Sequence, residues 1–141
     1  MSKNIVSVGV RVLIRKGDSL LLAQPKGADF HFFPGGGLEF NETAEDAVAR
    51  ELREELGMKL KGCIFIGTNE NRFADKSGNH HGIDLMFAVK VDRAHINSKE
   101  KHITFSFIKI SELSKAKILP KTLKKNVIKW LRDKKTFWGN G

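Results

Sequence analysis

The sequence has 141 residues, of which 40% are hydrophobic and 29% are charged. This composition excludes a disordered chain, and it excludes a helical membrane protein because no apolar run approaches the roughly 20 residues of a spanning helix. The length fits one domain over residues 1–141, and the formal net charge of +9 indicates attraction to anions such as nucleotides, nucleic acid or acidic lipid.

The cysteine content and the amino terminus bear on the compartment. Cys63 is the single cysteine, so it cannot form an internal disulfide, and a reducing setting is the default. Arg11 and Arg15 interrupt the apolar amino terminus, and no cleavage site follows them. We therefore expect a cytoplasmic protein without membrane contact, acting as a monomer or a homodimer.

Hydrophobic patterning predicts a β-hairpin at the start of the chain, with strands at residues 5–14 and 19–23 around a turn at 16–18. A polar loop follows at residues 24–31, and then the glycine-rich segment 34–37. The next periodic segment is helical. Thr43 is its expected N-cap, Asp46 completes a capping box, and Gly57 ends the helix after Leu56.

The second half of the sequence alternates strand-like and turn-like segments. Strands are predicted at residues 60–68, 83–91 and 103–110, with a turn at 75–79. A carboxyl-terminal helix carries an apolar face of Leu123, Val127, Ile128 and Leu131. Strands on both sides of a central helix, with a second helix at the end, indicate an α/β fold in which helices cover a mixed sheet.

The central helix places carboxylates where apolar groups are expected. At about 100° per residue, Glu55 falls about 20° and Glu51 about 60° from Val48, within or beside the core-facing stripe, while Glu54 lies about 120° away. A carboxylate there is costly unless it is paired or coordinates a metal. Mg²⁺ prefers carboxylate and water oxygens and commonly shares them with substrate phosphates, so it fits this cluster.

The loop before this helix adds backbone groups to the cluster. Gly35, Gly36 and Gly37 allow close backbone approach, so their amides or carbonyls can meet a metal or a phosphate. Arg50 adjoins Glu51 and precedes Glu54 by four residues, close enough to orient a carboxylate.

The spacing of these residues is specific. Five residues separate the glycine from the first glutamate, seven more separate that glutamate from Arg50, and the remaining positions follow at fixed intervals: Gly36, Glu42, Arg50, Glu51, Leu52, Glu54, Glu55, Gly57 and Met58. This pattern resembles the Nudix box, here residues 36–58, at every fixed position. Pro34-Gly35-Gly36 and Glu39 also resemble the usual lead-in of that family.

The resemblance implies a Nudix fold, which is an α/β/α sandwich with a mixed β-sheet and the box as a loop-helix-loop. It also implies Mg²⁺-dependent hydrolysis, with Mn²⁺ as a substitute, of a diphosphate linkage in a small nucleotide substrate: a nucleoside diphosphate derivative or a nucleoside triphosphate. The length is similar to that of mutator-type members.

The resemblance also implies roles for individual residues. Glu51, Glu54 and Glu55 would bind the metal, with the Gly36 carbonyl as a further ligand. Glu54 is our first choice for the general base. Family members resemble one another in using a downstream acid, for which Glu100, just before the strand at 103–110, is the candidate.

The substrate-binding candidates are Gly35, Gly37 and Arg72. Arg72, with Asn71, His80 and His81, borders the turn at 75–79, where it could contact phosphate or ribose; ordinary loop polarity is the alternative. The two adjacent histidines alternate faces on a strand, so we do not expect them to share a metal. The aromatic side chains Phe30, Phe32 and Phe33 allow base stacking or core packing.

The carboxyl-terminal segment is strongly basic, with nine Lys or Arg residues between Lys115 and Lys135 against Asp133 alone. A solvated helix face is the preferred interpretation, and an RNA or polyanion surface is the alternative.

The sequence is consistent with three functions. The first is a Nudix pyrophosphohydrolase that acts on small nucleotides. The second is removal of pyrophosphate from the 5′ end of RNA, which the basic segment suggests. The third is a nucleotide-sensing domain without hydrolysis, against which the intact glutamate set argues.

Overall fold

The computed structural model describes residues 3–92, 98 and 100–141. Seven strands form one sheet in the order β6-β2-β1-β5-β4-β7, with β3 paired to β1. The strands are β1 (Asn4–Lys16), β2 (Ser19–Pro25), β3 (Gly35–Gly37), β4 (Leu60–Asp75), β5 (Gly78–Val91), β6 (Ile103–Lys109) and β7 (Phe137–Asn140). The pairs β1–β5 and β4–β7 are parallel and the others are antiparallel, which confirms the expected mixed sheet.

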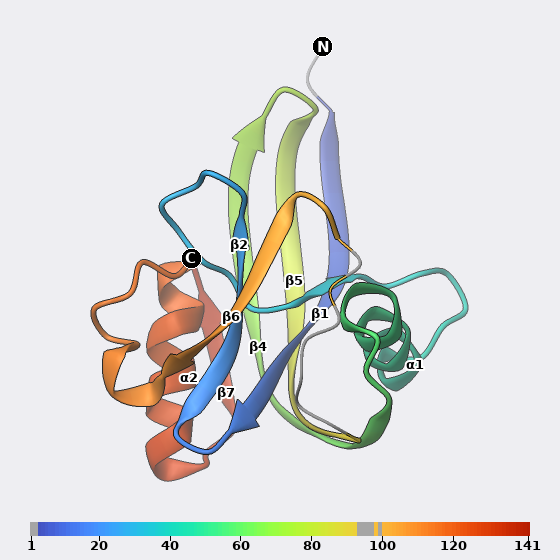
Figure 1. Cartoon of the computed structure of the whole chain (residues 1–141). Helices are drawn as coiled ribbons and strands as arrows, with labels where there is room; N and C mark the ends of the chain where they lie inside the picture. The colour runs from blue at the N-terminus through green and yellow to red at the C-terminus, as the bar shows by residue number, and fades with distance from the viewer. Residues whose placement is uncertain (1–2, 93–97, 99) are drawn as a thin grey trace.

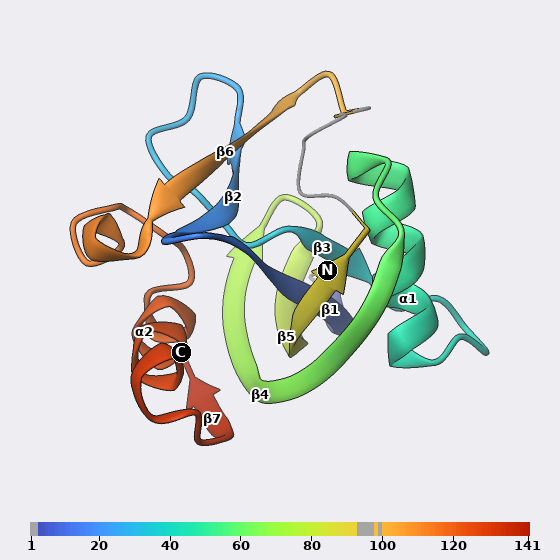
Figure 2. The same cartoon turned by 60° about the horizontal axis from the view of Figure 1, so that its bottom comes forward.

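Two helices lie on opposite sides of this sheet (Figures 1 and 2). One side is covered by α1 (Ala44–Glu51), which continues into the π-helical turn η1 (Leu52–Leu56). The other side is covered by α2 (Lys121–Asp133), which follows the 3-10 turn η2 (Ile110–Glu112). The arrangement is the predicted α/β/α sandwich. No helix in the described ranges is long and apolar enough to cross a bilayer.

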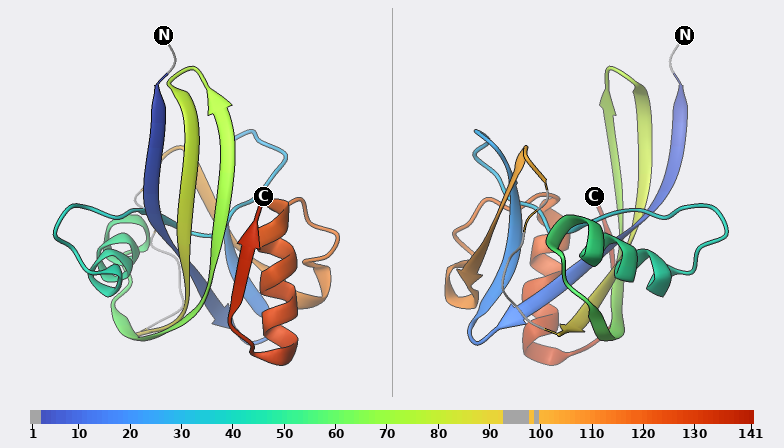
Figure 3. Two further views of the ribbon diagram at one scale, coloured as in Figure 1. Left: turned by 180° about the vertical axis from the view of Figure 1, so that it is seen from behind. Right: turned by 45° about the vertical axis from the view of Figure 1, so that its right-hand side comes forward.

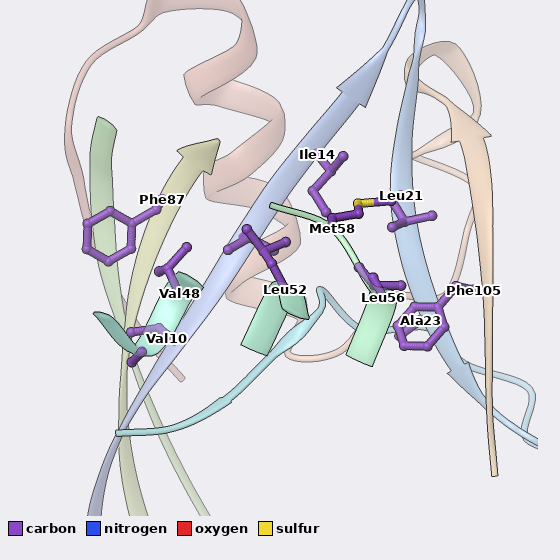
Figure 4. Packing of buried hydrophobic residues seen from close by; sticks show 12 residues of the cluster. Val10, Ile14, Leu21, Ala23, Val48, Leu52, Leu56, Met58, Phe87 and Phe105 are labelled. Carbon is purple, nitrogen blue, oxygen red and sulfur yellow. The ribbon is translucent and has the colours of Figure 1, made fainter. Parts of the chain in front are cut away.

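Each side of the sheet has its own apolar core. Beneath α1, the buried residues come from several elements: Val10, Ile14, Leu21, Ala23, Val48, Leu52, Leu56, Met58, Phe87 and Phe105 (Figure 4). Beneath α2, Leu13, Ile66 and Met86 pack with Leu123 and Val127 of the helix. The alternation of β1 therefore serves two cores, with Val10, Val12 and Ile14 toward α1 and Leu13 toward α2.

The predicted amino-terminal hairpin is correct only at its turn. β1 and β2 pair at Arg15↔Leu20 and Lys16↔Ser19, after which the two strands separate. β1 runs parallel to β5 from Asn4 to Ile14, and β2 pairs with β6 along its full length. Residues 20–23 are buried on both faces of β2, so local alternation could not reveal which strand lies beside it.

Two further differences concern strand length. The strands predicted at 60–68 and 83–91 extend to Asp75 and back to Gly78, because main-chain pairing continues through polar residues up to the turn. This end of the hairpin projects beyond both helices together with the start of β1 (Figure 3). Sequence patterning predicts no strand after the carboxyl-terminal helix, but Phe137–Asn140 forms β7 beside β4.

Candidate active site

The helix that carries Glu51, Glu54 and Glu55 begins as its sequence predicts. The Thr43 hydroxyl accepts a hydrogen bond from the Asp46 amide (3.1 Å), and the Asp46 carboxylate accepts one from the Thr43 amide (3.4 Å). This reciprocal capping box satisfies two amides that the first helical turn leaves free. Because the helix start is anchored in this way, Glu51, Glu54 and Glu55, about two to three turns later, occupy defined positions.

The last turn of the helix is wider than an ideal α-helix. Leu52–Leu56 is π-helical, and Gly57 ends it in the left-handed conformation at φ 65° and ψ 26°. A π turn changes the angular positions of Glu54 and Glu55 relative to an ideal helical wheel, and such turns occur frequently at functional sites. Even so, the burial predicted from the helical wheel is observed: the Glu51 and Glu55 side chains are at least partly buried, and the Glu54 side chain is 56% exposed.

Arg50 connects the carboxylates to the glycine-rich loop. Its guanidinium donates two hydrogen bonds to Glu42 (2.8 and 2.9 Å), one to Glu51 (2.9 Å) and one to the Gly37 carbonyl (2.9 Å). Glu54 lies 3.4 Å from the same guanidinium. The hydrogen bond from Arg50 lowers the pKa of Glu42 to about 2, so Glu42 is ionised at neutral pH. Arg50 therefore acts as a positioning residue, and the Gly37 carbonyl is already used by it.

Glu51 and Glu55 form the centre of the site. Burial, followed by the hydrogen bond and charge of Glu51, raises the pKa of Glu55 well above its usual range, while Arg11 acts in the opposite direction. The Glu51 carboxylate also lies against the backbone of Gly36, where a β-carbon would overlap it. Two adjoining carboxylates in a poorly solvated site need a proton or a cation between them, and oxygen donors of this kind fit Mg²⁺.

The remaining acidic candidates stand at the edge of this centre. Glu54 is directed toward Arg50 and solvent, and no three His, Cys, Asp or Glu side chains of the described residues converge as a metal cluster in this conformation. Glu100 is exposed, and its charge contributes to the raised pKa of Glu55. The structure thus brings Glu100 into electrostatic reach of the pair, although the sequence separation is 45 residues.

Arg11 and Asp84 belong to the site but were not among the sequence candidates. Arg11 lies 3.8 Å from Asp84, donates to the Phe33 carbonyl (3.1 Å), and has its guanidinium carbon 5.8 Å from the centre of the Phe32 ring. Burial raises the pKa of Asp84, and Arg11 offsets part of that effect. A signal was present: Arg11 stands between the core residues Val10 and Val12, so its charge had to face a specific partner.

A cavity of about 580 Å³ is lined in part by Phe32, the aromatic side chain that Arg11 contacts. Its lining comes from the loop before β3, from β4 and from the start of α2: Phe30, Phe32, Asn71, Leu119, Pro120, Lys121, Thr122 and Gly141. Phe32 both lines this cavity and packs against Arg11, so two side chains, Phe32 and Arg11, link the cavity to the carboxylate centre. Flat aromatic rings beside an amide are suited to a nucleobase.

Arg72 lies elsewhere. It lines a separate cavity with Phe73, Ala74 and His80, near the projecting end of the β4–β5 hairpin, whereas its neighbour Asn71 lines the cavity beside the site. His80 contacts Asp75 (2.9 Å) and His81 contacts Glu70 (2.8 Å). The two histidines thus have different partners, as strand alternation predicts.

Comparison with known proteins assigns the family. The model of the NUDIX domain matches residues 3–132. The chain belongs to the NUDIX domain family. This Nudix chain is 35% identical over 80 residues to an 8-oxo-dGTP diphosphatase of Proteus vulgaris, covering 54% of the chain and 71% of that relative. It is 28% identical over 127 residues to an ADP-ribose pyrophosphatase of Methanocaldococcus jannaschii, covering 88% of the chain and 74% of that relative.

Solved structures agree on the fold. A mutator MutT protein of Bacillus halodurans superposes with a TM-score of 0.79 at 18% identity, over 95% of this Nudix chain and 88% of that protein. A MutT protein of Methanosarcina mazei superposes with a TM-score of 0.70 at 20% identity, over 92% of this chain and 96% of that one. The predicted Nudix fold is confirmed.

Proposed function

We propose that this Nudix chain hydrolyses a diphosphate linkage in a compound that contains a nucleoside, with Mg²⁺ as cofactor and Mn²⁺ as its substitute. The observation that carries the proposal is the adjoining Glu51–Glu55 pair against the Gly36 backbone, where burial and the neighbouring Glu51 both disfavour the charged form of Glu55. The two relatives act on different compounds by their names, 8-oxo-dGTP and ADP-ribose, but one is named a diphosphatase and the other a pyrophosphatase, so both names denote hydrolysis of a phosphate anhydride.

Glu51 and Glu55 would hold the metal, with the Gly36 carbonyl and, after rotation, Glu54 as further ligands. When bound, Mg²⁺ neutralises phosphate charge and acidifies water. Arg50 keeps Glu51 in position through its hydrogen bond and anchors the preceding loop through the Gly37 carbonyl. The family model covers nearly all of the chain, which supports one catalytic domain.

The hydrolytic step is an in-line displacement at phosphorus. The oxygen of a water molecule bonds to phosphorus, the bridging phosphorus–oxygen bond breaks, and the departing phosphate keeps the electron pair. The proton of the attacking water passes to Glu54, because its carboxylate is exposed and adjoins Glu51 and Glu55 along the helix. Glu100 is the second candidate for this role, since its charge acts on Glu55.

The positive side chain of Arg11 and the neighbouring aromatic cavity support the substrate class. Arg11 lies between the carboxylate centre and Phe32, where its charge would attract a phosphate of the substrate. Phe30, Phe32 and Asn71 would then contact the nucleoside. This order along the site, carboxylates, arginine and aromatic rings, matches the order metal, phosphate and nucleoside.

The test is a screen of nucleoside triphosphates and nucleoside diphosphate derivatives with Mg²⁺, with products separated by ion-exchange chromatography. Glu54→Gln and Glu55→Gln should each abolish turnover in a folded protein. Glu45→Gln is the matched control, because Glu45 is exposed on the first turn of the same helix. Full activity of both site variants would refute the assignment, as would tight nucleotide binding without product over hours.

A further inference from the structure

Another cavity in the described part of the chain lies on the α2 side, away from the carboxylate centre. Its volume is about 690 Å³, and it is formed by α2 and the segment that precedes it. Its lining contains six cationic side chains: Lys117, Lys121, Lys124, Lys125, Lys129 and Arg132. No Asp or Glu is among the described residues that line it. We call this cavity the basic groove.

Two of the six cations have partners in the protein. Lys117 pairs with Asp29 (3.1 Å), and Lys124 donates to the carbonyls of Ser114 (2.8 Å) and Ala116 (2.7 Å). The other four are exposed, and none makes a hydrogen bond or an ion pair with the described residues: Lys121, Lys125, Lys129 and Arg132. The groove therefore has uncompensated positive charge directed at solvent.

The four exposed cations form a row along α2. They follow one another at intervals of four, four and three residues, which places them on one face of the helix. Like charges at this spacing repel each other, so the row destabilises the isolated helix. Between Lys121 and Arg132 the row extends about 16 Å along the helix axis, which is longer than one phosphate group.

The basic groove shares one lining residue with the aromatic cavity of the active site. Lys121 lines both cavities, because it stands at the first residue of α2 where Pro120 and Thr122 border the aromatic cavity. From there, Phe32 leads to Arg11 and the Glu51–Glu55 pair. An extended anion could therefore run from the carboxylate centre through the aromatic cavity into the basic groove.

We propose that the basic groove holds the sugar–phosphate backbone of a single-stranded nucleic acid whose 5′-terminal nucleotide occupies the aromatic cavity. The inference rests on the proposed hydrolysis and specifies its substrate as the 5′-phosphorylated end of a strand. A row of cations beside an aromatic cavity is the arrangement by which proteins bind single strands. A duplex does not fit, because its terminal base would have to unpair to enter the cavity.

The test measures strand binding separately from hydrolysis. An oligonucleotide of about ten nucleotides with a 5′-hydroxyl end is titrated by fluorescence anisotropy at several salt concentrations. Contacts from the four free cations predict a slope of log K against log salt of about −2.8, at roughly −0.7 per phosphate, so binding should weaken about fifty-fold from about 50 to about 200 mM salt.

Lys125→Gln/Lys129→Gln is the variant, because both side chains are exposed and lie outside the carboxylate centre. It should reduce the slope to about −1.4 and the salt effect to about sevenfold. Lys61→Gln/Lys90→Gln removes the same charge from exposed positions on β4 and β5 and should leave the slope unchanged. The variant should also lower kcat/KM for a 5′-triphosphorylated oligonucleotide relative to that for a nucleoside triphosphate.

The outcomes separate the two proposals. Turnover of nucleotides without oligonucleotide binding overturns the proposed role of the basic groove and leaves the hydrolysis proposal standing. Oligonucleotide binding with the expected slope, but no turnover of any substrate, supports the groove and refutes hydrolysis. Equal slopes in the two double variants overturn the groove. RNA and DNA oligonucleotides are compared in parallel, and binding of either with the expected slope supports it. Binding to anionic lipid vesicles in place of oligonucleotides overturns it.

Discussion

The close approach between Gly36 and Glu51 provides a sharp test of how the site is built. A β-carbon on Gly36 would lie 2.6 Å from the Glu51 carboxyl carbon and 2.9 Å from its second oxygen. An ordinary van der Waals contact is roughly 1 Å longer, so in the Gly36→Ala variant the Glu51 carboxylate must move by about that distance. Displacements of about 1 Å at a catalytic group can reduce a rate about a hundredfold, which corresponds to about 2.7 kcal/mol of transition-state stabilisation.

Gly62→Ala, on β4 and outside the carboxylate centre, is the matched control. A β-carbon there has no neighbour within 4 Å, so its rate should stay within about twofold of the parent protein. Initial rates of nucleotide hydrolysis are measured across a range of Mg²⁺ concentrations, and urea unfolding checks that both variants are folded. Because the obstruction meets the end of a flexible side chain, Gly36→Ala should lose activity with little loss of stability. Equal rates for the two variants would refute the proposed role of the Gly36–Glu51 contact.

Three further substitutions test the support of the site. Arg50→Lys should lower both the melting temperature and the activity, because an ammonium group cannot reproduce the forked contacts of the Arg50 guanidinium. Arg53→Lys is the control, since Arg53 is exposed on the same helix, and it should have a smaller effect. Equal melting temperatures for the two variants would contradict this prediction. Glu42→Gln should reduce the loss of stability on acidification, because it removes the contribution of this one carboxylate. The pKa of Glu42 falls from an ordinary 4.5 to about 2, so its contribution is present above about pH 4.5 and is lost as the pH falls toward 2. Denaturant titrations between those pH values should show a flatter profile for the variant, and an unchanged profile would count against the Arg50 contact. Leu52→Ala should cost about 2–5 kcal/mol of unfolding free energy because Leu52 is 1% exposed, and a loss below about 1 kcal/mol in urea unfolding would be inconsistent with that packing.

Features that depend on residues within one local segment could be predicted from the sequence. The capping box of Thr43 and Asp46 and the helix end at Gly57 depend only on residues three or four apart, and both occur as expected. The burial of Glu51 and Glu55 followed from helical periodicity, because the apolar residues that define the core stripe belong to the same helix. The roles of Glu54 and Glu100 remain predictions.

Features that depend on distant segments could not be predicted. The separation of β1 from β2 beyond the turn, and the pairing of Phe137–Asn140 with β4, are choices among strands that all present suitable backbone. Asn71 and Arg72 show the same limit within one strand: side-chain direction follows from register, which placed Asn71 beside the active site and Arg72 in another cavity.

The sequence alone determined the family resemblance, the sandwich of helices and mixed sheet, and the charged face of the central helix, since short-range spacing encodes all three. The tertiary structure decided which groups meet that face. It brought Arg11 to Asp84 and Phe32, and it connected the aromatic cavity to the basic groove through Lys121. Strand order and helix packing set these contacts, because they form between residues far apart in the chain.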